Sequence, residues 1–216
     1  MSKKKVLILT YYWPPASGPA VNRMLSWVNH LCNEGHAVHV LTVKNPSNLA
    51  EDPQLLEDIP NSAKIHKTTT YEPFGIYKAL KGKKNAETTV GLPTDSKSQL
   101  SRLALYIRLN YFIPDPRIGW KHTAINKAVD IIKKENIDVL ISSSPPHSTQ
   151  VIASKIKEKT NIKWWADYRD PWTKLYHYDQ KSFSKKVKDK QALLEKQCLD
   201  KADKVITIGH LSLIHI

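Results

Sequence analysis

The sequence predicts an α/β fold, in which a doubly wound, mostly parallel, Rossmann-like sheet lies between helices. Short apolar runs alternate along the chain with segments of helical periodicity, which is the pattern of such folds. Several runs are apolar throughout, as strands buried on both faces of a parallel sheet require. The chain has 216 residues, enough for one good-sized domain, which buries roughly 70% of its unfolded surface.

The apolar runs are predicted to be strands. They span residues 6–10, 37–43, 64–67, 139–142, 163–166 and 205–208. Two polar, turn-rich segments, 46–59 and 81–101, carry no strand signal. The second lacks the apolar residues needed for a core, so we expect a long mobile loop there.

Helical patterns fill most of the remaining chain. After the first strand comes a turn with Gly18, and Pro19 suits the first turn of the helix behind it. That helix has an apolar face made by Val21, Met24, Leu25, Val28, Leu31 and Cys32. Further helices are predicted over 123–136, 148–160 and about 184–201. An apolar and aromatic stretch, 103–113, is predicted to be a buried helix, with a helix on a membrane surface as the alternative.

The composition limits the kinds of partner. A formal net charge of +13, concentrated in lysines at 3–5, 81–84 and 185–190, favours an acidic membrane face or phosphorylated substrates, although a solvated lysine-rich surface explains it as well. No zinc-finger or RNA-recognition signature is present, so nucleic acid is not an expected partner. The two cysteines, Cys32 and Cys198, form no disulfide framework or metal spacing. We therefore expect a cytoplasmic protein. Its positive charge would also allow peripheral attachment to the inner face of the membrane.

Three polar loops follow predicted strands. Gly18 follows the first strand, His147 follows the strand at 139–142, and an acidic and basic cluster follows the strand at 163–166. In a parallel sheet, ligands bind beyond the carboxyl ends of the strands. We therefore expect these loops to meet at one edge of the sheet.

The first two loops offer groups for a phosphate or a hydroxyl. Gly18 allows close backbone approach to a donor pyrophosphate or an acceptor phosphate, or it merely connects strand and helix. Arg23 on the following helix can bind a phosphate bidentately, or it is simply solvated. His147, behind two stiffening prolines, can orient an acceptor hydroxyl or carry a proton, and a surface histidine is the alternative.

The third loop carries Asp167, Arg169 and Asp170. Carboxylates beside a guanidinium suit the binding of acceptor hydroxyl groups, with one aspartate as a possible base. The alternative is an aspartate–arginine pair that braces the loop before Pro171 and Trp172. No Asp-x-Asp metal motif is present.

Several segments together resemble the N-terminal domain of glycosyltransferases with the GT-B fold, particularly the retaining family four. The first loop carries Pro14, Pro15, Gly18 and Arg23 in the family's pattern, although Pro19 stands where many members have a second glycine. The later matching segments are 34–42, 144–148, 166–172 and 202–207. The resemblance therefore covers most of residues 5–208.

The resemblance implies that residues 1–210 are the acceptor-binding half of such an enzyme. The donor would be a nucleotide sugar, held mostly by a second domain that is missing here, with no other cofactor and no obligatory metal. The acceptor would be a saccharide or a lipid-linked sugar in cell-surface polysaccharide synthesis, and this half alone would transfer no sugar. Residues 211–216 match the translation of a sequencing adapter, so we expect them to be a non-native tail.

The resemblance also bears on two arginines. Related enzymes often have a histidine where this chain has Arg169, so a histidine's role as base does not transfer to this position. A similar Pro-bracketed segment in related enzymes places Asp115 and Arg117 near the acceptor cleft, whereas a purely structural turn is the alternative.

Two other classes of function are weighed. One is a non-catalytic α/β module that binds a nucleotide or a phosphate. The other, a nicotinamide dehydrogenase, is disfavoured because Lys44 and Asn45 follow the second strand where an acidic residue would bind a ribose hydroxyl.

Overall fold

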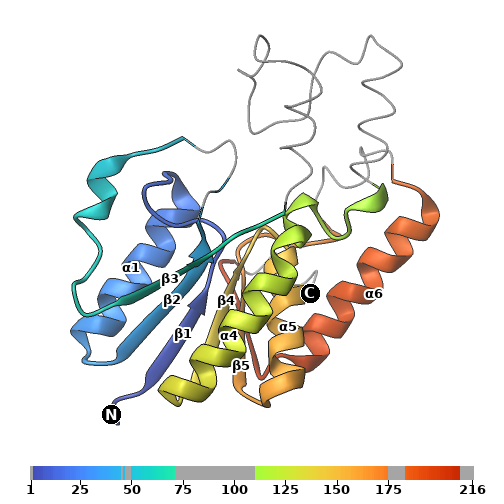
Figure 1. The fold of residues 1–216 in the computed structure, drawn as a ribbon. Coiled ribbons are helices and arrows are strands. Elements are labelled where there is room, and N and C mark those ends of the chain that lie inside the picture. Colours follow the sequence, from blue (N-terminus) through green and yellow to red (C-terminus); the bar gives the residue numbers. More distant parts are fainter. Residues whose placement is uncertain (1, 45, 47–49, 72–109, 175–182, 210–216) are drawn as a thin grey trace.

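The computed structural model describes residues 2–44, 46, 50–71, 110–174 and 183–209. Its strands are β1 (Lys5–Leu9), β2 (Ala37–Val43), β3 (Lys64–Thr68), β4 (Val139–Ser144), β5 (Lys163–Tyr168) and β6 (Lys204–Thr207). They form one sheet in the order β3-β2-β1-β4-β5-β6 (Figure 1). Each neighbouring pair is parallel. The predicted doubly wound parallel sheet is therefore confirmed.

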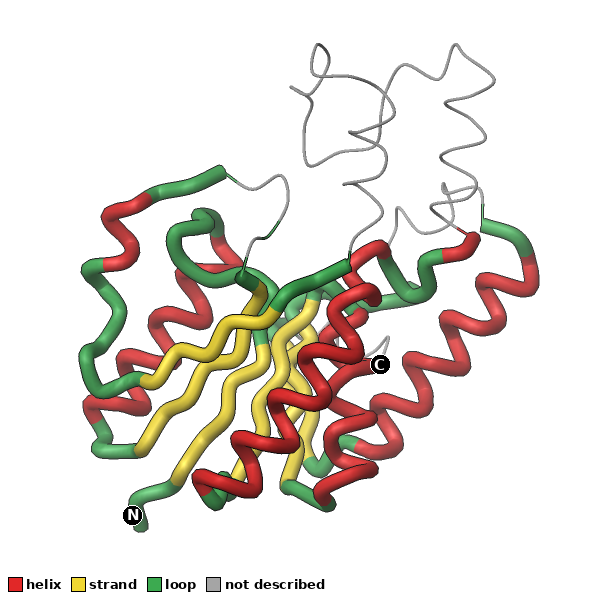
Figure 2. The backbone as a smooth tube through the Cα atoms, in the orientation of Figure 1, coloured by secondary structure: helices red, strands yellow, loops and turns green. Residues whose placement is uncertain are grey.

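Helices cover both faces of this sheet. The α-helices are α1 (Pro19–Asn33), α4 (Lys121–Glu135), α5 (Ser148–Thr160) and α6 (Lys185–Lys201), and the short 3₁₀ helices are η1 (Pro53–Leu56) and η3 (Pro116–Trp120). In Figure 2 the helices flank the strands as separate layers. The apolar side of α1 packs on one face, and α4 and α5 pack on the other.

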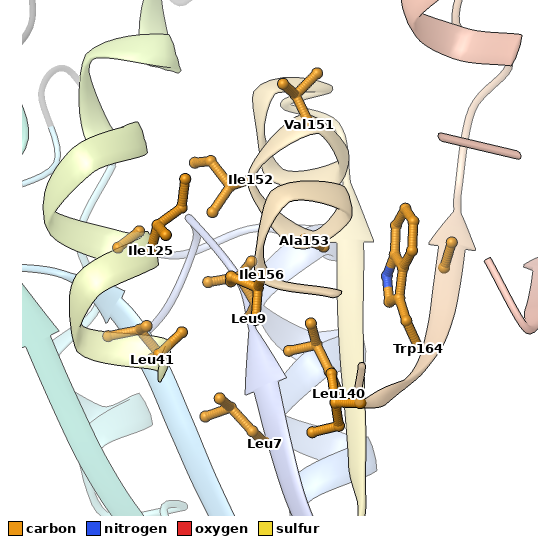
Figure 3. Packing of buried hydrophobic residues seen from close by; sticks show 14 of the residues in the cluster. Leu7, Leu9, Leu41, Ile125, Leu140, Val151, Ile152, Ala153, Ile156 and Trp164 are labelled. Carbon is orange, nitrogen blue, oxygen red and sulfur yellow. The ribbon is translucent and has the colours of Figure 1, made fainter. Parts of the chain in front are cut away.

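Strand alternation divides the core into two clusters. In β1, Leu7 and Leu9 point to the α4–α5 side, whereas Val6 and Ile8 point to the side of α1. Figure 3 shows the first cluster, in which strand residues meet apolar side chains of α4 and α5. Its labelled members are Leu7, Leu9, Leu41, Ile125, Leu140, Val151, Ile152, Ala153, Ile156 and Trp164. Because both faces of the central strands are buried, β1 is apolar over residues 6–9 and β4 is apolar over residues 139–141.

The start of α1 follows the expected local rules. Gly18 caps the helix with φ 123°, a conformation that side chains rarely adopt, and Pro19 is the first helical residue. The chain then leaves the helix through Gly35, which also has positive φ. Glycine at the two ends of the helix thus allows the tight β1–α1–β2 connection.

The structure corrects one element boundary that matters for function. The sequence predicted that β5 ends at residue 166, with Asp167 in the following loop. Instead β5 continues to Tyr168, because Ser143 and Ser144 of β4 pair with Asp167 and Tyr168. Asp167 is consequently a buried strand residue.

Some expectations concern residues that the structure does not describe. The predicted mobile loop at 81–101, most of the apolar stretch 103–113 and the tail 211–216 lie outside the described residues. At the end of that stretch, Tyr111 is exposed and Ile113 is half-buried. In the described ranges, every helix is too short or too polar to cross a bilayer.

Candidate functional site

Helix α1 and strand β5 are joined by an ion pair. Arg23, in the second turn of α1, reaches across the sheet edge to Asp167 of β5. Its Nη2 donates to Asp167 Oδ1 at 2.8 Å, and its Nε donates to Oδ2 at 3.2 Å. The guanidinium also lies 4.7 Å from the ring centroid of Trp27, one turn further along α1. Arg23 is therefore held by a bidentate contact and is not simply solvated.

Asp167 accepts a further hydrogen bond from β4. Ser143 Oγ donates to its Oδ2 at 2.8 Å. The side chain is 0% exposed, and Arg23 is 27% exposed. The buried Asp167 carboxylate therefore holds the Arg23 guanidinium at the sheet edge. Loss of Arg23 would leave this carboxylate buried without its opposite charge, which is costly.

Arg169 joins the loop after β5 to the loop after β4. Its Nη2 donates to the carbonyl oxygen of Pro145, two residues before His147. Burial lowers the pKa of the Arg169 guanidinium, while the nearby carboxylates of Asp167 and Asp170 counteract this effect. Its Nε is buried without a hydrogen-bond partner within the described part of the chain. Asp170 follows at the exposed end of this turn.

His147 stands at the beginning of α5 and contacts the loop after β5. Its ring stacks on the indole of Trp172, with centroids 4.9 Å apart and planes 2° apart. The ring is half-buried, whereas Trp172 is buried. The second and third predicted loops therefore meet through both this stack and the Arg169–Pro145 bond.

Two residues of α6 hold Trp172, and sequence reasoning missed both. The indole Nε1 donates to Gln191 Oε1 at 2.7 Å, and the backbone N–H donates to Glu195 Oε1 at 3.2 Å. The sequence did contain a signal, because both polar residues occupy the buried stripe of α6. That stripe consists of Val187, Gln191, Glu195 and Cys198. Polar side chains in such positions need buried partners.

The Pro-bracketed turn docks against the start of α5. Asp115 accepts from the backbone N–H of Arg117 at 2.9 Å, and from Ser148 N and Oγ at 2.8 and 3.0 Å. Burial raises the pKa of Asp115, and the hydrogen bonds from Ser148 and Arg117 oppose that shift. The guanidinium of Arg117 lies 5.5 Å from the ring centroid of Tyr11, in the loop after β1. The turn therefore contacts both the start of α5 and the loop after β1.

The space beside the Gly18 backbone, where a side chain would lie in another residue, is not filled by neighbouring atoms in the described part of the chain. Within the described residues, no atom lies within 4 Å of the position that a Cβ at Gly18 would occupy. The carbonyl of Gly18 accepts from Val21 N and Asn22 N at 3.0 and 3.1 Å, which begins the helix. A ligand could approach the backbone here without displacing a side chain.

Two further observations bear on the location of the site. The described ranges contain no cluster of three or more histidine, cysteine or acidic side chains suited to a metal ion. An open groove of about 740 Å³ runs between α1 and the β2–β3 connection. It is lined by Asn22, Leu25, Ser26, Asn29, Leu55, Glu57, Asp58, Ile59, Pro60 and Asn61. None of the predicted site residues lines it, so we assign the candidate site from the cluster of loop side chains.

Comparisons with known proteins give similarity at the level of structure only. No protein-family model matches the chain. No curated protein sequence matches it. The similar solved structures include MurG of Acinetobacter baumannii, UGT2 of Phytolacca americana complexed with UDP-2fluoro-glucose and pterostilbene, and a glycosyltransferase from Rickettsia africae.

The three similar structures share little sequence with this chain and are longer than it. MurG is 10% identical, with a TM-score of 0.46 over 94% of this chain and 41% of its own. UGT2 is 10% identical, with a TM-score of 0.49 over 99% of this chain and 49% of its own. The Rickettsia protein is 17% identical, with a TM-score of 0.41 over 97% of this chain and 43% of its own. This chain therefore spans less than half the length of each.

Proposed function

We propose that this chain is the N-terminal, acceptor-binding half of a retaining glycosyltransferase of the GT-B type. The observation that carries the proposal is that α1, the end of β5 and the loops after β4 and β5 meet at one sheet edge. Arg23 of α1 pairs with Asp167 of β5, and Arg169 in the loop after β5 donates to the carbonyl oxygen of Pro145 in the loop after β4. Ligand binding at the carboxyl ends of parallel strands is the rule for open α/β sheets.

The exposed groups at this edge suit a saccharide. Asp170 is exposed and His147 is half-buried, so both can meet acceptor hydroxyl groups. Asp167 already accepts three hydrogen bonds, so we assign it to positioning Arg23, and we assign the role of base to Asp170. Gly18, with its open side, is proposed to approach the departing phosphate of the donor.

The basic groups suit an acceptor with its own negative charge. Arg117 and Arg169 flank the loops after β1 and β4, and the whole chain carries a net charge of +13. We therefore propose a phosphorylated or lipid-linked sugar acceptor in cell-surface polysaccharide synthesis, reached at the anionic inner face of the membrane from the cytoplasm. The donor is a nucleotide sugar, which a second domain would hold, and we propose no metal, other cofactor or nucleic-acid partner.

Calorimetric titration of the 216-residue chain with a hexose 1-phosphate, the free hexose and UDP-glucose tests this proposal. We expect the hexose 1-phosphate to bind more tightly than the free hexose. The Arg169→Gln variant should lose at least tenfold in affinity, about 1.4 kcal/mol. Lys196→Gln, an exposed change on α6, should bind as the wild type does. We also expect no transfer of glucose from UDP-glucose.

The titration can contradict the proposal in three ways. If no sugar binds, or if Arg169→Gln binds unchanged while still folded by circular dichroism, the acceptor site is wrong. Tight binding of UDP without binding of any sugar would instead support a non-catalytic nucleotide-binding module. Transfer of glucose by this chain alone would contradict its proposed dependence on a second domain.

A further inference from the structure

A set of buried contacts connects α6 to His147. Gln191, which is 1% exposed, uses both ends of its side-chain amide. Its Oε1 accepts from Trp172 Nε1 at 2.7 Å, and its Nε2 donates to the carbonyl oxygen of Pro114 at 3.0 Å. One side chain thereby links the loop after β5 to the turn that precedes η3.

Both arms of this link lead to the same histidine. On one arm, the indole of Trp172 stacks on the His147 ring at 4.9 Å. On the other arm, Pro114 precedes Asp115, whose carboxylate binds the N–H and hydroxyl of Ser148, the residue after His147. The ring face and the adjoining backbone of His147 are therefore restrained from two directions that meet at Gln191.

The two partners require a side chain that accepts one hydrogen bond and donates another, as a glutamine amide does. An indole N–H can only donate and a proline carbonyl can only accept, so the orientation of the amide follows from its partners. A glutamate at this position would lose the donor to Pro114, and a leucine would lose both bonds. Glu195 supplements the first arm, since it accepts from the backbone N–H groups of Trp172 and Thr173, both at 3.2 Å.

We propose that Gln191 is a positioning residue that sets the orientation of the His147 ring for the acceptor. The role in acceptor binding rests on the proposed function, whereas the positioning itself is a property of this chain. A side chain on α6, which carries none of the motif loops, thus controls the geometry of a loop after β4. The stacked indole covers one face of the ring, so a ligand meets the ring from the other side.

The test uses NMR of the histidine rings in the 216-residue chain, which holds nine histidines. His147→Gln assigns the His147 signal. In the wild type we expect a ring-current shift of the His147 ring protons and a nuclear Overhauser contact with the Trp172 ring. Gln191→Leu should abolish or strongly reduce that shift, and Gln191→Glu, which keeps the acceptor for Trp172, should reduce it less.

Gln197→Leu is the matched control, because Gln197 lies on the same helix but is exposed. It should leave the His147 signal unchanged. If Gln191→Leu fails to fold, Gln191→Met keeps the length of the side chain but offers Trp172 Nε1 no oxygen acceptor and Pro114 no donor, and should still reduce the ring-current shift. The proposal is overturned if the wild type lacks the Overhauser contact, or if folded Gln191→Leu or Gln191→Met retains the wild-type shift.

Failure of the proposed function gives a different result. In that case the His147 shift would respond to Gln191→Leu as expected, but a hexose 1-phosphate would perturb neither His147 nor its neighbours. Conversely, sugar binding that perturbs His147 equally in the wild type and in Gln191→Leu would retain the function and reject the positioning role.

Discussion

The two halves of the sheet are built from different chemistry. In the β3-β2-β1 half, the central strands bury aliphatic side chains such as Leu7, Ile8 and Val40. In the β4-β5-β6 half, three consecutive serines, 142–144, end β4 and are buried together with Gln150 and Asp167. Contacts between aliphatic side chains favour burial but do not depend strongly on the direction of approach. Buried polar groups, in contrast, need particular hydrogen-bond partners at particular distances.

The polar half is closely connected. Gln150 Oε1 accepts from Ser142 Oγ at 2.5 Å, and its Nε2 donates to Ser144 Oγ and to the Asp167 carbonyl, both at 2.9 Å. Trp164 Nε1 donates to Ser142 Oγ at 2.7 Å. This network fixes the ends of β4 and β5, from which the loops of the candidate site emerge. Most residues of the candidate site, such as His147, Asp167 and Arg169, therefore belong to the half with directional core contacts, whereas Gly18 and Arg23 come from the apolar half.

The largest expected effect comes from breaking the apolar half. Leu9→Ala removes a fully buried side chain between β1 and the α4–α5 layer. We expect it to lower the free energy of unfolding by about 4 kcal/mol through lost burial and a residual cavity. Urea denaturation measures the change. Leu193→Ala, at an exposed leucine of α6, should cost far less, and equal losses would contradict the assigned core.

A slightly smaller loss is expected in the polar half. Asp167→Asn removes the charge that pairs with Arg23 while preserving size, and should lower the free energy of unfolding by about 3 kcal/mol. This is the lower end for a buried pair because Arg23 retains 27% exposure. Asp200→Asn, in an exposed pair with Lys196, should cost less than about 1 kcal/mol. If both variants unfold at the same urea concentration, Asp167 does not organise the site.

The smallest effect concerns a titratable pair within the otherwise apolar half. His39 of β2 and His66 of β3 have stacked rings, with Nδ1 of His39 3.2 Å from Nε2 of His66. Burial lowers the pKa of both rings. Lysines 5, 64 and 127 lower one or both pKa values further, whereas Glu135, whose Oε2 is 3.8 Å from His39 Nε2, opposes the shift.

The sign of the pH dependence follows from these shifts. Folding favours the neutral rings, so their contribution to stability is complete above the ordinary histidine pKa of about 6.5 and is lost as the pH falls below it. We expect the free energy of unfolding of the wild type to decline between pH 7 and pH 5 more steeply than that of His39→Gln. His122→Gln, at an exposed position, should follow the wild-type curve. Parallel curves for the wild type and His39→Gln would refute this coupling.

Much of the fold could be predicted from local pattern. The bounds of β2 and α5 match the predicted ranges 37–43 and 148–160, because hydrophobic period and flanking turn residues are encoded within each segment. The end of β5 could not be predicted in the same way. It depends on pairing of Asp167 and Tyr168 with the serines of β4, and a strand partner leaves no local signal in the sequence.

The candidate site was likewise predictable in part from the sequence. Sequence pattern and family resemblance selected Gly18, Arg23, Arg117, His147, Asp167, Arg169 and Asp170, and the parallel topology brought their loops to one sheet edge. Only the tertiary structure decided that Arg23 binds Asp167, and that Gln191 and Glu195 hold the tryptophan beneath His147. Residue type and periodicity are local properties of the chain. The choice of partner for a buried polar group depends on which distant segments packing places within hydrogen-bonding distance.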